Sequence, residues 1–178
     1  MSSTDRPDRS ELHENEQYFF DQETLATLTS FLMPHAPVCC VCAPLLGQRL
    51  AEAGVGVTIL DVDDRFSKVD GFKSFDVSRP VWLGEEFGII VCDPPFHGVS
   101  LSQLFVAIRV LSRNDYRQPL MLSTLKRREA ATLGAFSSFE LAPSGYHPGY
   151  RTVEACDRND IEFLTNLDQD ALARLRDD

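Results

Sequence analysis

Short apolar runs alternate with amphipathic stretches along most of this chain. Residues 38–41, 57–60 and 88–92 each have the length and apolar composition of a buried strand. Residues 45–53 lie between the first two runs and end at Gly54, which is typical of a helix end. A strand, a helix and a strand with short links form a βαβ unit, whose right-handed crossover makes the two strands parallel. The pattern therefore predicts an α/β fold with a mostly parallel, twisted sheet.

Further elements follow from the same periodicities. Residues 21–32 carry apolar side chains at i, i+3 and i+7, with Asp21 or Thr24 as the N-cap, and predict an amphipathic helix. Additional helices are expected over residues 101–111 and 127–136, and additional strands over residues 72–75, 119–123, 139–141, 153–155 and 161–165. Residues 1–15 lack such periodicity and predict a disordered leader, which leaves one domain over residues 16–178.

Composition narrows the class of protein. No run of about 18 apolar residues is present, and residues 1–17 are polar and acidic, which argues against a membrane span and a secretion signal. The 5 Cys include Cys39, Cys40 and Cys42 in one apolar run, where alternate side chains point to opposite faces and cannot form one tetrahedral metal site. We therefore predict reduced core thiols, no metal site, and a cytoplasmic or nuclear protein.

Net charge bears on nucleic-acid binding. The formal net charge of −10 makes the average surface repel phosphate backbones, which proteins bind largely through Lys and Arg. A local basic cluster, Lys126-Arg127-Arg128, departs from this average, although its pattern is also that of a solvated helix face. The role of these three residues stays open at the level of sequence.

Acidic residues follow the second and third of the predicted strands. Asp61 and Asp63 come at the end of the second strand, and Asp76 follows the third. Ligands of open parallel sheets bind in the crevice beyond the carboxyl ends of the strands. A carboxylate after the second strand can accept hydrogen bonds from a ribose diol, and Asp76 can meet an adenine amino group. The sequence therefore predicts a nucleoside-binding crevice, although each acid taken singly also fits a helix cap.

The strongest local signal is Asp93-Pro94-Pro95-Phe96, here named the proline corner, directly after the apolar run that ends at Cys92. Two prolines fix φ and remove two backbone donors, so the corner offers unpaired carbonyl oxygens as acceptors. An amino group held by the Asp93 carboxylate and the Pro94 carbonyl has both protons engaged, which leaves its lone pair free to attack a methyl group. Phe96 adds a flat wall that can stack on a base or contact an ammonium. These four residues are the predicted catalytic centre.

Substrate contacts are predicted on two further segments. His97 follows the proline corner and can relay a proton. The Gly- and Pro-containing loop that carries Tyr146, His147 and Tyr150 has the composition of a substrate loop. Both segments also fit ordinary solvated connections.

Four segments occur in an order that resembles a known family. They are Gln17-Tyr18-Phe19-Phe20 with Gln22-Glu23-Thr24, Cys39-Cys40-Val41-Cys42-Ala43-Pro44, Leu60-Asp61-Val62-Asp63 with Arg65-Phe66, and Asp93-Pro94-Pro95-Phe96. Over most of its length the chain resembles the N6-adenine methyltransferase-like family, which includes elongation-factor-1A lysine methyltransferases and the methyltransferase domain of the zinc-knuckle ribosomal RNA adenine methyltransferase. The resemblance implies a Rossmann-like methyltransferase fold with helices on both faces of the sheet and S-adenosylmethionine as cofactor.

The resemblance also implies roles for individual residues. The proline corner would meet the acceptor, and the cofactor would lie against Phe19, Phe20, Thr24, Cys42, Ala43, Pro44, Asp61, Asp63, Arg65 and Asp76. The glycine-rich signature of many methyltransferases is absent, because the first loop holds only Gly47.

Three functions stay open on the sequence alone. Phe96, the segment Leu60-Asp61-Val62-Asp63 and the segment 161–166 resemble the ribosomal RNA adenine branch of the family, and this resemblance implies methylation of adenine N6 in DNA or RNA. The zinc-binding modules of that branch are not found in these residues, so a nucleic-acid substrate implies an accessory partner, a small target or a local basic groove. The first alternative is a protein-lysine methyltransferase acting on a translation factor such as elongation factor 1A, which suits a single small domain. The second is a non-catalytic Rossmann-like binding module, against which the intact proline corner argues.

Overall fold

The structure is a computed structural model that describes residues 10–154 and 156–177. Within this part of the chain, one seven-stranded sheet has the strand order β3-β2-β1-β4-β5-β7-β6. The strands are β1 (Val38–Val41), β2 (Val57–Asp61), β3 (Phe72–Ser74), β4 (Ile89–Cys92), β5 (Leu120–Leu125), β6 (Ala142–Pro143) and β7 (Ile161–Thr165). Strands β1 to β5 pair in parallel, whereas β7 is antiparallel to both of its neighbours. The predicted mostly parallel sheet is confirmed.

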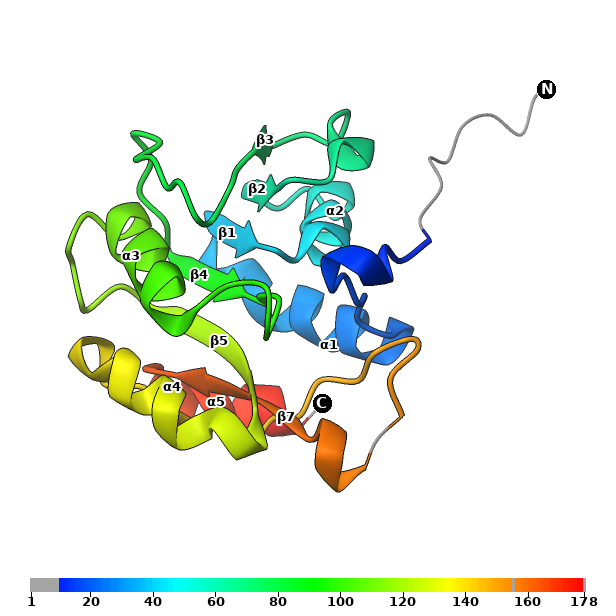
Figure 1. Ribbon diagram of the computed structural model, residues 1–178. Helices are drawn as coiled ribbons and strands as arrows, with labels where there is room; N and C mark the ends of the chain where they lie inside the picture. Colours follow the sequence, from blue (N-terminus) through cyan, green and yellow to red (C-terminus); the bar gives the residue numbers. More distant parts are fainter. Residues whose placement is uncertain (1–9, 155, 178) are drawn as a thin grey trace.

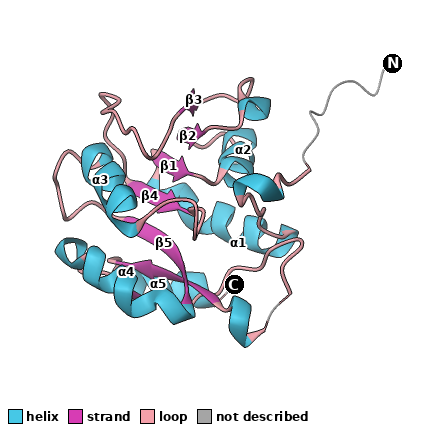
Figure 2. Cartoon of the chain, viewed as in Figure 1, coloured by secondary structure: helices cyan, strands magenta, loops and turns pink. Residues whose placement is uncertain are grey.

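Helices cover both faces of this sheet (Figures 1 and 2). They are α1 (Gln22–Leu32), α2 (Pro44–Glu52), α3 (Leu101–Leu111), α4 (Glu129–Ala135) and α5 (Gln169–Arg176). Buried leucines of α1, α2 and α5 share one apolar cluster with alternate strand residues such as Cys40. Buried residues of α3 pack in a second cluster with the intervening strand residues, such as Cys39. Neighbouring cysteines therefore face opposite layers, as the period of a strand requires.

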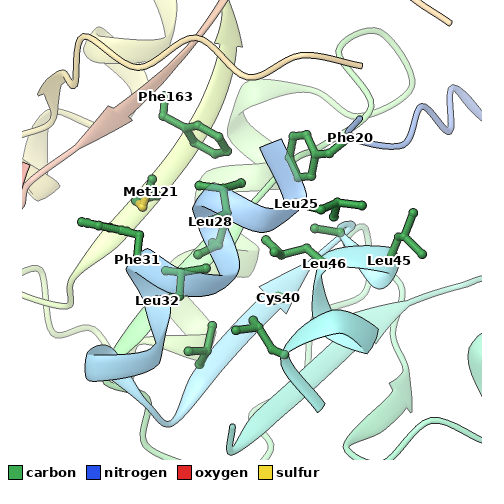
Figure 3. Close-up of a cluster of buried hydrophobic side chains, with 14 of the residues drawn as sticks. Phe20, Leu25, Leu28, Phe31, Leu32, Cys40, Leu45, Leu46, Met121 and Phe163 are labelled. Atoms are coloured by element: carbon green, nitrogen blue, oxygen red, sulfur yellow. The ribbon is translucent and has the colours of Figure 1, made fainter. Parts of the chain in front are cut away.

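Helix α1 packs against α2 and α5, and its buried side chains lie in the apolar cluster that these helices share with the sheet (Figure 3). Leu25, Leu28 and Leu32 are fully buried and follow the i, i+3, i+7 spacing that places side chains on one face of a helix. Asp21 rather than Thr24 is the N-cap, because an oxygen of its carboxylate accepts a hydrogen bond from the Thr24 amide at 2.8 Å. The apolar stripe thus fixes α1 against the sheet.

Substitution of Leu28 tests this packing. Leu28→Ala is expected to lower the free energy of unfolding by about 2–5 kcal/mol, since it removes buried methyl groups and leaves a cavity in a closely packed layer. Urea unfolding followed by circular dichroism measures the change. Val106→Ala, at an exposed position of α3, is the control and is expected to change that free energy by less than about 0.5 kcal/mol. Equal effects of the two substitutions would contradict the assigned role of α1.

Some predicted elements differ from the structure. The strand expected over residues 139–141 is wrong, because Phe139 is buried at the end of a 3-10 helix (Ser137–Phe139) and Glu140 then adopts a left-handed φ of 55°. Val153 and Glu154 are loop, and residue 155 of that predicted strand lies outside the described residues. Helix α5 was not predicted, because only Leu172 and Leu175 form its buried face and the rest is polar.

The N-terminal segment also departs from expectation. Residues 10–15 were expected to be disordered, yet residues 13–15 form a 3-10 helix (His13–Asn15). The carboxylate of Glu11 accepts hydrogen bonds from the Phe19 amide at 2.7 Å and from the Thr152 hydroxyl at 2.7 Å. Side-chain hydrogen bonds hold this segment in place. The sequence therefore shows no apolar periodicity there from which an ordered structure could be predicted. The rest of the predicted leader, residues 1–9, lies outside the described residues.

A membrane span is not found in the described part of the chain: none of its helices combines the length and the apolar character that crossing a bilayer requires.

Candidate active site

A cavity of about 670 Å³ opens at the carboxyl ends of the parallel strands. Its walls come from the segments that follow β1, β2, β3 and β4, and from the N-terminal segment, residues 10–20. In Figure 1 the arrowheads of β1 and β4 point toward this blue N-terminal segment. The volume falls within the range of small-molecule sites, roughly 300–1,000 Å³. The cavity therefore lies where open α/β sheets bind ligands.

The segment after β2 supplies two carboxylates with different environments. Asp63 is buried, and although burial raises its pKa, hydrogen bonds from Arg65 and Gln17 outweigh that effect and hold the pKa below its usual value. The Gln17 side-chain amide donates to Asp63 Oδ2 at 2.8 Å, and the Arg65 guanidinium donates to the same oxygen at 2.9 Å. Both oxygens of Asp63 are thus engaged within the protein.

Asp61 differs because its hydrogen bonds come from backbone amides. The Asp63 amide donates to Asp61 Oδ1 at 2.8 Å, and the Val62 amide contributes a further hydrogen bond to the carboxylate. Burial raises the pKa of Asp61 to about 6. No side chain of the described residues donates to this carboxylate, so it can still accept hydrogen bonds from a ligand in the cavity.

The segment after β3 adds a third acid at the cavity wall. Asp76 is exposed between the buried side chains of Phe75 and Val77, and all three line the cavity. The hydroxyl and the amide of Ser78 both donate to Asp76 Oδ1, and these hydrogen bonds lower the pKa of the Asp76 carboxyl. Asp76 is therefore held as an anion at the cavity rim.

The loop after β1, residues 42–44, forms part of the cavity wall. Cys42 has a left-handed φ of 57°, and Pro44 occupies the first turn of α2, where a missing N–H costs nothing. A Cβ on Gly47 would lie 2.5 Å from a side-chain carbon of Ile59, so this glycine allows α2 to pack closely on β2. Its role is helix–strand packing one turn away from the cavity wall.

The proline corner follows β4 and forms another part of the cavity wall. The Asp93 amide still donates to the Val41 carbonyl at 3.1 Å, so the corner starts directly from the ladder between β1 and β4. The Ser123 hydroxyl donates to Asp93 Oδ1 at 2.6 Å, and the Tyr150 hydroxyl donates to the same oxygen at 2.7 Å. Burial raises the pKa of Asp93 to about 6, while these two hydrogen bonds oppose the rise.

Neighbouring segments fix the rest of the corner. The Arg128 guanidinium donates to the Phe96 carbonyl, and the carboxylate of Glu16 accepts a hydrogen bond from the His97 amide at 2.9 Å. Of the basic cluster, Lys126 pairs with Glu129 at 2.9 Å, and Arg127 is exposed. One residue of the cluster therefore contacts the corner, whereas the other two fit the solvated surface expected from the sequence.

The structure brings most of the predicted site residues together around one cavity. Those that line it are Phe19, Phe20, Cys42, Ala43, Pro44, Asp61, Asp63, Arg65, Asp76, Asp93, Pro94, Pro95, Phe96 and Tyr150. Four predicted residues do not line it, namely Thr24, His97, Tyr146 and His147. The Thr24 hydroxyl accepts from the Gly149 amide at 2.8 Å, and the His147 imidazole contacts Asp160 at 2.8 Å. The Tyr146 ring stacks on Phe163.

Sequence reasoning missed three contributors to the site. Gln17 bridges Asp63 and Arg65, and Val62 lines the cavity with its side chain exposed. Ser123 lies in the buried strand β5 and reaches Asp93 because β5 is the sheet neighbour of β4. A hydroxyl in an otherwise apolar run is a signal available in the sequence, although its partner depends on the strand order.

Comparison with known proteins defines the class. The sequence profile of the family described as "Probable N6-adenine methyltransferase" matches residues 11–156, and the chain belongs to this family. The fold is similar to the crystal structure of a protein from Pyrococcus horikoshii described as a "putative RNA methyltransferase". That match has a TM-score of 0.56 and 14% sequence identity, and covers 88% of this chain and 89% of the other. No curated protein matches the chain.

The protein is thus a member of a methyltransferase family with a Rossmann-like α/β fold. The resemblance read from the four sequence segments is confirmed.

Proposed function

We propose that this protein is an S-adenosylmethionine-dependent methyltransferase that methylates N6 of adenine in DNA or RNA. The observation that carries the proposal is that one cavity is lined by two carboxylates, Asp61 and Asp93, each of which can still accept a hydrogen bond from a ligand. Asp61 can accept from a ligand at the β2 end, and Asp93 presents one oxygen without a described donor at the β4 end. Membership in the family supports the chemistry of methyl transfer.

The residues on the β2 side fit the proposed cofactor. Asp61 is placed to accept hydrogen bonds from a ribose diol, because its carboxylate receives only backbone donors in the described structure. Asp63 instead holds Arg65 and Gln17, so it shapes the wall and leaves no oxygen for the diol. The exposed side chain of Val62 and the carboxylate of Asp76 suit the face and the amino group of an adenine ring. S-adenosylmethionine supplies an electrophilic methyl group when it is bound.

Other residues that were predicted to contact the cofactor also line the cavity. Phe19 and Phe20 line the cavity from the N-terminal segment, and Cys42, Ala43 and Pro44 line it from the loop after β1. Apolar lining with a few placed polar groups is typical of cofactor sites.

The proline corner holds the acceptor amine. Asp93 Oδ2 and the Pro94 carbonyl accept the two N–H groups of an adenine amine, which turns its lone pair toward the methyl donor. Phe96 lines the same wall and can stack on the base. Rate then comes mainly from alignment, because an in-line displacement between two bound partners gains much from fixed orientation. The amine nitrogen gains the methyl group, the donor leaves as the neutral thioether, and the amine proton passes to the Asp93 carboxylate or to solvent during or after attack.

The environment of Asp93 favours a neutral amine as acceptor. A lysine ammonium must lose a proton before it can attack, and a buried carboxylate anion beside it stabilises the charged form. An adenine amine is neutral and needs only acceptors for its two N–H groups. The formal net charge of −10 implies that a nucleic-acid substrate is recruited through an accessory partner, as a small target, or through a local basic surface that includes Arg128.

A labelling experiment tests the acceptor. The protein is incubated with S-adenosylmethionine carrying a labelled methyl group and with fractionated cell extract, and the protein, RNA and DNA fractions are then counted. We expect the label in RNA or DNA, recovered as N6-methyladenine after nuclease digestion. Label in a single protein band, recovered as methyl-lysine, would contradict the adenine acceptor. Cofactor binding without transfer to any fraction would favour a non-catalytic binding module.

A further inference from the structure

Two hydroxyl groups from different parts of the chain donate to a single oxygen of Asp93. Resting on the proposed function, we infer that Tyr150 and Ser123 are positioning residues that hold Asp93 Oδ1 and thereby present Oδ2 to the acceptor amine. The distances are 2.7 Å from the Tyr150 hydroxyl and 2.6 Å from the Ser123 hydroxyl. Neither residue needs to touch the substrate for this role.

The geometry defines the orientation of the carboxylate. A carboxylate on a short side chain rotates easily, and its terminal torsion has a broad energy minimum. Two short hydrogen bonds to one oxygen from separate elements, β5 and the loop that precedes β7, remove that freedom. No described residue donates to Oδ2, so the oxygen left for a ligand is the one that faces away from both donors.

Both hydroxyls are committed to Asp93 rather than to solvent. Ser123 is 2% exposed within β5, and Tyr150 is 9% exposed. Burial and the neighbouring Asp93 raise the pKa of the Tyr150 phenol well above its usual value, so the phenol stays a neutral donor. A role for Tyr150 through Asp93 therefore fits the structure better than the direct substrate contact expected from the loop composition.

The loop that carries Tyr150 is joined to the segment that lines the cofactor side. Tyr150 forms an antiparallel bridge with Phe20, and their ring centroids are 5.2 Å apart. The Asp21 amide donates to the Gly149 carbonyl at 2.9 Å, and the Arg151 amide donates to the Phe19 carbonyl at 3.0 Å. The position of the Tyr150 hydroxyl is therefore set in part by the segment of Phe19 and Phe20, which also lines the cavity.

The titratable groups facing Asp93 from each neighbouring element are few. They are the Tyr150 phenol from the loop, the Cys42 thiol from the corner after β1, and the Cys92 thiol from β4, while Ser123 on β5 is uncharged. Burial raises the pKa of both thiols well above the usual value, so neither ionises when Asp93 does. A change in the titration of Asp93 therefore reports on its two hydrogen bonds.

Titration of Asp93 in Tyr150→Phe and Ser123→Ala tests the inference without an assay for activity. Full-length protein is labelled with carbon-13 at its aspartate carboxyl groups, and NMR follows the Asp93 signal across pH, assigned through an Asp93→Asn variant. Each substitution removes one donor to the ionised form, so we expect the pKa of Asp93 to rise further by about one unit. Tyr116→Phe and Ser112→Ala, whose side chains lie away from the cavity lining, are the matched controls and are expected to leave that pKa unchanged.

Methyl transfer to an adenine-containing RNA oligonucleotide, or to its DNA equivalent, adds the functional readout. At saturating S-adenosylmethionine, which removes the contribution of Asp61, we expect the acid limb of kcat/KM for the oligonucleotide to move to higher pH by the same amount in both variants. At about pH 8.5, where Asp93 is ionised in all of them, kcat is expected to stay lowered by about 10-fold because the carboxylate is no longer held. An unchanged pKa of Asp93 and an unchanged acid limb in both variants would overturn the inference.

The outcomes separate this inference from the proposed function. A shifted Asp93 titration without methylation of either oligonucleotide supports the positioning role and contradicts the adenine acceptor. Methylation of adenine without a shift in the Asp93 pKa of either variant supports the adenine acceptor and contradicts the positioning role. If Tyr150→Phe fails to fold, Ser123→Ala decides the question, because it removes the other donor to the same oxygen.

Discussion

Asp93→Ala is expected to lower the rate of methyl transfer by at least about 100-fold while changing the affinity for S-adenosylmethionine by less than about threefold. The substitution removes the oxygen that holds one N–H group of the acceptor, and oriented acceptors or donors at a reacting centre are worth about this much. The carboxylate follows β4, whereas Asp61 ends β2, and β1 lies between these two strands in the sheet. Single-turnover kinetics measure the rate, and calorimetric titration measures the affinity.

Asp93→Asn tests whether the acceptor amine needs the second carboxylate oxygen. The single amide oxygen would take the place of Oδ1, to which Ser123 and Tyr150 donate, and an NH2 donor would take the place of Oδ2, so we expect activity close to that of Asp93→Ala. In the wild type the ionised carboxylate is the accepting form, so kcat/KM should fall as the pH drops through the raised pKa of about 6. At saturating S-adenosylmethionine, which removes the contribution of Asp61, the residual activity of Asp93→Asn should lack this acid limb. Asp70→Ala, an exposed residue outside the cavity lining, is the control. Full activity of Asp93→Ala would refute the proposed centre.

Asp61→Ala is expected to weaken the binding of S-adenosylmethionine by about 10- to 100-fold. Hydrogen bonds from a ribose diol to a buried carboxylate are charge-assisted, and the loss of such a bond costs roughly one to two powers of ten in affinity. Calorimetric titration or equilibrium dialysis measures the change. At saturating cofactor, kcat should be affected much less than the dissociation constant, because Asp61 ends β2 and the proline corner follows β4, with β1 between these strands.

The affinity for S-adenosylmethionine should also decrease as the pH falls. Burial raises the pKa of Asp61 to about 6, and protonation removes the negative charge that accepts from the diol. Cofactor binding should therefore weaken as the pH falls through about 6 in the wild type and be flat over that range in Asp61→Ala. Asp70→Ala again serves as the control, with binding unchanged. If Asp61→Ala bound as tightly as the wild type, the assignment of Asp61 to the ribose would be wrong.

The acidic residues at the strand ends show which part of the site can be predicted from the sequence pattern. Apolar runs locate β1, β2 and β4, and parallel pairing then gathers the residues after them at one edge of the sheet. Asp61, Asp76 and the proline corner were predicted in this way, and all of them line the cavity. Local order along the chain was sufficient, because the side of a parallel sheet on which strands end does not depend on details of packing.

Other residues show that the sequence pattern does not predict the hydrogen-bond partners of individual side chains. Asp61 and Asp63 are equivalent in the sequence, yet Gln17 and Arg65 occupy only the second of them. Thr24 and His147 were predicted at the site and instead bond to Gly149 and Asp160. Gln17 and Gly149 are distant in the chain from Asp63 and Thr24, and residue types alone do not predict which partner such a side chain meets.

The sequence by itself determined the parallel core, the order of its acidic strand ends and the family, since apolar periodicity and a rigid proline pair are properties of local chain geometry. Only the tertiary structure decided which carboxylate oxygen is free. The Tyr150 hydroxyl reaches Asp93 across 57 positions of sequence, and the Ser123 hydroxyl reaches it because β5 pairs with β4. Such contacts arise from the packing of separate elements, and hydrogen-bond geometry exists only after that packing is complete.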